Sequence, residues 1–318
     1  MSSIRLVVAL CLSSLMIPAI TLAQTDSTQP VRIIVPYAVG GLIDVMNRVM
    51  ANRMSQTLGQ AVVVENRPGA NANIGPALVM QAPPDGRTLL ASASYFSSNP
   101  LIEAKLQWDP KNLMPVARFA ISPNIMVVPR SSPANTLKEL LALAKTSPGM
   151  PVMDAGRGAP QTMVQEILQD SAKAVFTPVQ YKGGTSYVPD LVAGTLSAGV
   201  VPFNVALGLV KSGDLKGLAV TSKERSPLLP DVPTMAESGF PEAGVDSWLG
   251  YHVPAGTPPD VVRRLVAAVE EAAGDAGVQA RLASFGAQSA FLDTAAFDAF
   301  LLEDLTRARR LVGLVKVK

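Results

Sequence analysis

Short apolar runs alternate with amphipathic helical patterns along most of the chain, and this alternation constrains the fold more than any other feature. Runs of this length between helical segments are typical of βα units, whose strands form mainly parallel sheets covered by helices on both faces. The sequence therefore predicts an α/β fold. From residue 261 to 317 we expect only helices, packed back on the first sheet. The predicted strands are 31–35, 62–64, 88–91, 125–128, 152–155, 176–179, 198–201 and 218–220.

Two lobes are the natural organisation for 318 residues, because this length is near the limit of a single hydrophobic core. Residues 119–124 and the proline-rich segment that begins at 226 resemble crossings between lobes. We expect lobe 1 to comprise residues 24–122 and 226–318, and lobe 2 to comprise residues 123–225. A ligand cleft between the lobes is then predicted where the strand-to-helix turns of both meet.

The amino terminus has the pattern of a secretory signal peptide. A positively charged start precedes an apolar run at 6–20, and small residues stand before Gln24. We expect residues 1–23 to be a signal peptide that is removed on export to the periplasm. A membrane anchor is the alternative, but the run is short for a bilayer and polar sequence follows directly. Cys11, the only cysteine, would leave with the signal peptide.

Composition and motifs argue against several functional classes. The formal net charge is only +2 and no basic tract is present, so nucleic acid is not an expected partner. No cluster has metal-ligand spacing, and the phosphate-loop and dinucleotide-binding motifs are absent, so we expect neither a metal nor a cofactor. His252 is the sole histidine, and we interpret the segment after it, residues 253–256 (VPAG), as structural rather than catalytic. We expect no enzyme, with a periplasmic hydrolase as the less favoured alternative.

A glycine turn follows the first predicted strand. Gly40 and Gly41 permit a sharp turn and leave the first N–H groups of the next helix uncovered, which is a suitable seat for a small anion. The alternative is that the two glycines only make a tight connection. We interpret Asp44 as a first-turn acid stabilised by the helix dipole rather than as a ligand contact.

Several motifs stand in the order found in one family. The chain resembles the tripartite tricarboxylate transporter receptors, the Bug family of periplasmic solute-binding proteins, over essentially its whole length after the signal peptide. The motifs are 35–44 (VPYAVGGLID), 62–70 (VVVENRPGA), 82–90 (APPDGRTLL), 181–184 (YKGG), 218–222 (LAVTS), 229–234 (LPDVPT) and 254–258 (PAGTP).

The resemblance implies a periplasmic binding protein type II fold, with two lobes that hold a small carboxylate in the cleft between them. In such receptors backbone N–H groups and ordered water hold most of the ligand. Carried over by position, the first wall of the cleft would be Tyr37, Gly40, Gly41 and Leu42. The second wall would be Ala155, Gly156, Gly158 and the segment from there to Thr162, with Tyr181, Gly183 and Gly184 beside it.

The chain departs from the family pattern at both walls. Leu42 replaces a frequent third glycine, and Ala159 and Pro160 stand where the family usually has hydroxyl residues. We therefore hypothesise a less polar cleft that prefers a carboxylate with an apolar or aromatic body. Arg157 could bind a carboxylate bidentately, and the alternative is a solvated loop arginine.

The predicted function is an extracytoplasmic receptor that captures a small carboxylate reversibly for a tripartite tricarboxylate-type transporter. We expect a monomer whose lobes close on the ligand and present a surface to membrane transporter subunits. A periplasmic sensor that delivers its ligand to a signalling kinase is the alternative.

Overall fold

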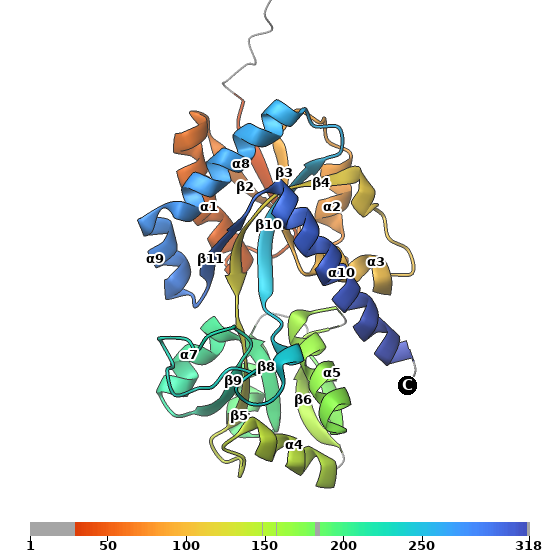
Figure 1. Ribbon diagram of the computed structural model, residues 1–318, viewed down its shortest axis with the longest axis vertical. Helices are drawn as coiled ribbons and strands as arrows, with labels where there is room; N and C mark the ends of the chain where they lie inside the picture. The colour runs from red at the N-terminus through yellow and green to blue at the C-terminus, as the bar shows by residue number, and fades with distance from the viewer. Residues whose placement is uncertain (1–28, 148, 157, 182–184, 317–318) are drawn as a thin grey trace, which may run out of the picture.

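A computed structural model of the chain describes residues 29–147, 149–156, 158–181 and 185–316. Its strands form two sheets, seen in the upper and lower parts of Figure 1. The first sheet has the strand order β11-β4-β10-β3-β1-β2, and the second has the order β7-β6-β8-β5-β9. The strands are β1 (Val31–Val35), β2 (Val62–Asn66), β3 (Thr88–Ala93), β4 (Leu113–Ser122), β5 (Asn124–Pro129), β6 (Met150–Asp154), β7 (Phe176–Gln180), β8 (Ala198–Pro202), β9 (Leu215–Val220), β10 (Ser247–Pro254) and β11 (Gln288–Leu292).

Helices cover both sheets. Around the first sheet, α1, α8 and α9 pack together on one side, and α3 and α10 pack together on the other (Figure 1). The α-helices are α1 (Leu42–Leu58), α2 (Ile74–Met80), α3 (Tyr95–Ile102), α4 (Leu137–Thr146), α5 (Pro160–Ala172), α6 (Val188–Ala193), α7 (Phe203–Lys211), α8 (Pro259–Gly274), α9 (Ala276–Ser284) and α10 (Thr294–Lys316); two 3-10 helices are η1 (Pro110–Asn112) and η2 (Pro241–Ala243).

Each apolar run of the sequence overlaps a strand, but the expectation of mainly parallel sheets was wrong. Parallel pairing joins β1 to β2 and β3, and β6 to β7 and β8. The other pairings, β10 with β3 and β4, β11 with β4, and β5 with β8 and β9, are antiparallel. The sheets are mixed because three strands run against the βα units: β5, where the chain enters the second sheet, and β10 and β11, where it has returned to the first.

The expectation of helices alone after residue 261 was also wrong. Strand β11 forms there and pairs with β4 at the edge of the first sheet. Its residues are exposed or half-buried, so no strong apolar pattern marks the strand in the sequence. The pairing with β4, distant in the chain, determines its conformation.

The chain passes between the sheets twice. Strand β4 continues through Pro123 into β5, and the return runs from the end of β9 through residues 221–246 to β10. Leu229 and Val232 of this return pack in the core of the second sheet, whereas the sequence predicts a return to lobe 1 near residue 226. Ala308 of α10 also packs there, so the last helix touches both halves (Figure 1). The full lobe boundaries remain a prediction.

Within the described ranges, the model contains no helix that is both long and apolar enough to span a bilayer.

Candidate functional site

The first candidate wall is the loop between β1 and α1. Gly40 has a φ of 82°, a conformation that favours glycine, and Gly41 is extended where it caps α1 without a side-chain hydrogen bond. The N–H of Gly40 donates to Asp44 Oδ2 at 2.9 Å, and that of Gly41 donates to the carbonyl of Ala38 at 3.4 Å. Both glycine N–H groups therefore serve the loop itself.

The next two N–H groups belong to Leu42 and Ile43, the first residues of α1. Neither donates to an acceptor in the part of the chain that the structure describes. They precede the first hydrogen bond of the helix, in which Val45 N–H donates to the carbonyl of Gly41. Free N–H groups and the positive end of the helix dipole make this position suited to an anion.

Asp44 holds the first wall in shape. Its side chain is buried and accepts hydrogen bonds from Gly40 N–H, from Arg48 and, at 2.9 Å, from Asn66 Nδ2. Burial alone would raise the pKa of this carboxyl, but the bonds from Arg48, Gly40 and Asn66 outweigh it and lower the pKa. Asp44 lies in the first turn of α1, as expected, and its carboxylate is occupied by contacts within the first wall; that it does not contact the ligand stays a prediction.

Tyr37 lies half-buried beside this loop. Its ring meets the ring of Tyr95 edge to face, with centroids 5.9 Å apart, and desolvation raises the pKa of its hydroxyl. Its carbonyl accepts from Asn66 Nδ2 at 3.0 Å. Tyr37 is thus held between the first wall and the start of α3.

The second candidate wall is the loop between β6 and α5. Gly156 and Gly158 have φ values of 95° and 77°. Asp154, buried at the end of β6, accepts from Gly156 N–H at 2.9 Å and from the Thr162 hydroxyl at 2.8 Å. An aspartate therefore orders the glycine turn in each wall. Pro160 begins α5, so the first available helical N–H groups are those of Gln161 and Thr162.

The predicted hydroxyl donors serve internal contacts. Thr162 donates to Asp154, and Tyr181 donates to Asp190 Oδ2 at 2.6 Å, a hydrogen bond that, together with partial burial, raises the pKa of Tyr181 to about 12. Ala155 is exposed at the tip of its loop. The remaining predicted residues, Arg157, Gly183 and Gly184, lie outside the described residues.

The second wall touches the first half of the molecule at α3. A Cβ added to Gly158 would lie 2.5 Å from Ser98 Oγ and 3.1 Å from Ile102 Cδ1, so the loop backbone packs directly on this helix. Tyr95, which contacts Tyr37, is on the same helix. Helix α3 therefore joins the two walls.

Sequence reasoning missed α3 as a site element. Residues 94–99 (SYFSSN) form a polar segment directly after the apolar strand β3, a parallel neighbour of β1. Because parallel strands end at the same edge of a sheet, this segment could have been placed beside the glycine turn. That signal was available in the sequence.

His252, the one histidine that could serve an enzyme, does not lie in either candidate wall. His252 is fully buried, stacks on Phe96 at a centroid distance of 4.0 Å and contacts Ser92 Oγ through Nδ1 at 2.8 Å. Burial lowers the pKa of His252 to about 3, so the imidazole is neutral at physiological pH. Among the described residues no group of three or more His, Cys, Asp or Glu side chains is placed to hold a metal ion.

Comparison with known proteins decides the family. The model of the "Tripartite tricarboxylate transporter family receptor" matches residues 46–316. The chain belongs to this family. The match begins just after the first wall, whereas BugT of Bordetella pertussis aligns over 96% of this chain and 95% of its own length, with 31% identity over 314 residues.

Solved structures of proteins with similar sequences have the same fold. A protein of R. palustris solved with adipate is 27% identical, with a TM-score of 0.81, and the alignment covers 90% of this chain and 96% of that one. MatC of Rhodopseudomonas palustris, solved with bound malate, is 28% identical with a TM-score of 0.76, over 89% and 98% of the two chains. The predicted periplasmic binding protein fold is confirmed.

The family and its solved neighbours are solute-binding receptors, and receptors of this family are periplasmic. This tripartite tricarboxylate receptor is therefore a solute-binding receptor and not an enzyme. Neither the hydrolase nor the kinase-linked sensor gains support from these relatives.

Proposed function

We propose that the receptor captures a small carboxylate between the start of α1 and the start of α5 and delivers it to the membrane subunits of a tripartite transporter. Adipate and malate in two solved relatives support a carboxylate as the ligand class. At the first wall, Leu42 and Ile43 offer N–H groups without a described acceptor, at the positive end of a helix.

Apolar residues in both walls support a ligand whose body is apolar or aromatic. Val39 is 71% exposed in the loop of the first wall, and Leu42 is half-buried at the start of α1. Ala155 and Ala159 occupy the second wall, and the Thr162 hydroxyl there already donates to Asp154. We expect the ligand to place its carboxylate on the N–H groups and an apolar or aromatic body against these side chains.

A thermal-shift panel tests this preference. Mono-, di- and tricarboxylates, aromatic ones included, are compared with the primary alcohol or amide of the same carbon skeleton. An acid with an apolar body should raise the melting temperature most, because ligand that binds only the folded state stabilises it. Citrate or another tricarboxylate giving the largest shift would contradict the apolar preference, and equal shifts from acid and amide would contradict the anion seat.

The amino-terminal assignment is part of the same proposal. Removal of residues 1–23 on export would give a periplasmic protein that begins at Gln24 and functions as a monomer. Intact mass measurement of protein released from the periplasm tests this, because retention of the first 23 residues would leave a much larger mass.

A further inference from the structure

The two passages between the sheets meet at one buried point. Asn124 begins β5 directly after the first passage, and Thr221 begins the return after β9. Both side chains are buried, and Thr221 N–H donates to the carbonyl of Asn124 at 2.9 Å. The two passages are thus hydrogen-bonded side by side where relative motion of the two halves would concentrate.

One hydroxyl joins three segments at this point. Asn124 N–H donates to Thr221 Oγ1 at 2.8 Å, and Thr221 Oγ1 donates to Asp246 Oδ1 at 2.6 Å. Asp246 is the last residue before β10, which belongs to the first sheet. The Thr221 hydroxyl therefore ties the start of β5 to the end of the return.

The side chain of Asn124 extends the connection to the second wall. Its Nδ2 donates to the carbonyl of Val245 at 3.3 Å, and its Oδ1 accepts from Gln161 Nε2 at 2.7 Å. Gln161 lies in the first turn of α5, next to Pro160 and Thr162. The start of α5 is thus linked by a side-chain hydrogen bond to the point where both passages meet.

We propose that Asn124, Thr221 and Asp246 form a crossover clamp that fixes the angle between the two sheets, with Gln161 as the positioning residue that holds the start of α5 on it. The role of this clamp in capture rests on the proposed function. Loss of the Thr221 hydroxyl would leave the buried Asn124 N–H and the Asp246 carboxylate without their partner, so the clamp should open.

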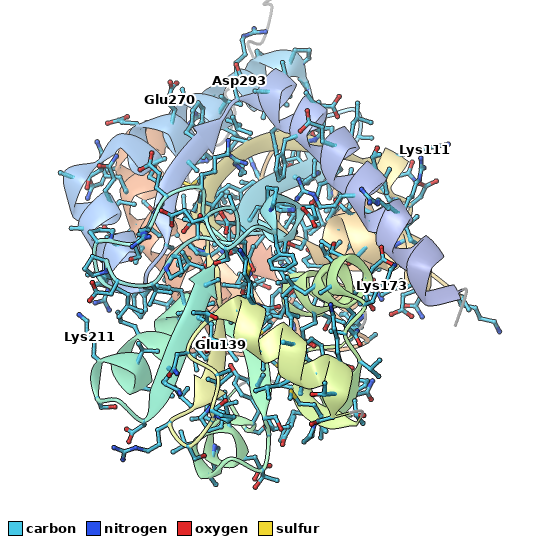
Figure 2. The ribbon with its side chains drawn as sticks, turned by 60° about the horizontal axis from the view of Figure 1, so that its bottom comes forward. Lys111, Glu139, Lys173, Lys211, Glu270 and Asp293 are labelled. Carbon is cyan, nitrogen blue, oxygen red and sulfur yellow. The ribbon has the colours of Figure 1, made fainter. Side chains whose placement is uncertain are left out.

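The distance between the halves can be measured without ligand. Spin labels on cysteines at Glu270 of α8 and Lys211 of α7, exposed residues labelled in Figure 2, report this distance, with Cys11 replaced by serine. Electron double-resonance spectra of T221V should show a broader distribution with longer distances than the parent. T221S retains the hydroxyl and should restore the parent distribution.

The role of Gln161 is tested by the same distance measurement, with a second glutamine of α5 as the control. Q161A, at a half-buried surface position, should fold and broaden the distribution. Q165A is the control on the same helix, because the buried Gln165 donates to the carbonyl of Met153 inside the second half and makes no hydrogen bond to either passage among the described residues. An unchanged distribution in Q161A, or equal broadening in Q161A and Q165A, overturns the assignment. Because no ligand is present, this failure is distinct from a failure of the proposed function.

Discussion

At the scale of single residues, each wall has an aspartate that accepts from a glycine N–H of the same loop. Asp44 binds Gly40 and Asp154 binds Gly156. These bonds keep loops with unusual backbone angles in one conformation, and in the first wall Arg48 compensates the negative charge. The ligand would therefore meet a preorganised surface.

Replacing Asp44 by asparagine should lower the free energy of unfolding at pH 7 by about 1.5–3 kcal/mol, the range for hydrogen bonds to a charged group. The pKa of Asp44 is lowered in the folded protein, so its contribution is complete above the ordinary aspartate pKa and is lost as the pH falls through the lowered value. The difference between parent and D44N should thus shrink in acid. Urea unfolding at several pH values measures it.

Asp298, exposed on α10, supplies the control for this series. D298N should match the parent within about 0.5 kcal/mol, as is usual for surface substitutions. A difference between parent and D44N that stays constant down to pH 3 would contradict the assigned role of the carboxylate.

At the scale of elements, the close packing of the second wall on α3 gives a direct prediction. In G158A the new Cβ would collide with Ser98, and alanine at a φ of 77° is strained. Gly213 has a φ of 76° with open space around it, so G213A carries the same backbone strain without the collision. We expect both variants to lose about 1–2 kcal/mol of stability from the strain, and G158A alone to lose ligand affinity by calorimetry. Equal affinities in the two variants would contradict the contact.

The attachment of α10 predicts a pH effect of opposite sign. Asp304 accepts from Trp248 Nε1 at 2.9 Å, and burial raises the pKa of Asp304 despite that bond. The folded state then holds the proton more tightly than the unfolded state, so this group lowers stability as the pH rises through its ordinary and then its raised pKa. D304N, which stays neutral, should gain stability relative to the parent over that window, whereas D298N should not. A flat difference between D304N and the parent would refute this account.

Elements with their own local pattern could be predicted from the sequence. β1 has the expected bounds, because its apolar run and the glycine turn after it are both local signals. β11 could not be predicted, since its pairing with β4 is set by tertiary structure. In the site, the glycine turns were predictable because the glycines directly follow apolar runs in the sequence. The internal use of the Thr162 and Tyr181 hydroxyls was not, because their acceptors Asp154 and Asp190 become neighbours only in the fold.

At the scale of the whole molecule, the two sheets are joined by two passages, a helix that touches both cores and a loop contact at α3. Helix α1 follows a strand of the first sheet and α5 follows a strand of the second. A ligand that contacts the starts of both helices would therefore favour one arrangement of the two halves. The function proposed for the receptor depends on N–H groups at these two starts binding an anionic oxygen.

Calorimetric titration of the best-bound acid of the panel against its methyl ester tests this dependence most directly. The ester keeps the size and the apolar body of the ligand but removes the charge that the helix starts would stabilise. We predict measurable affinity for the acid and none for the ester. Retention of the acid's affinity by the ester would contradict capture of a carboxylate by backbone N–H groups.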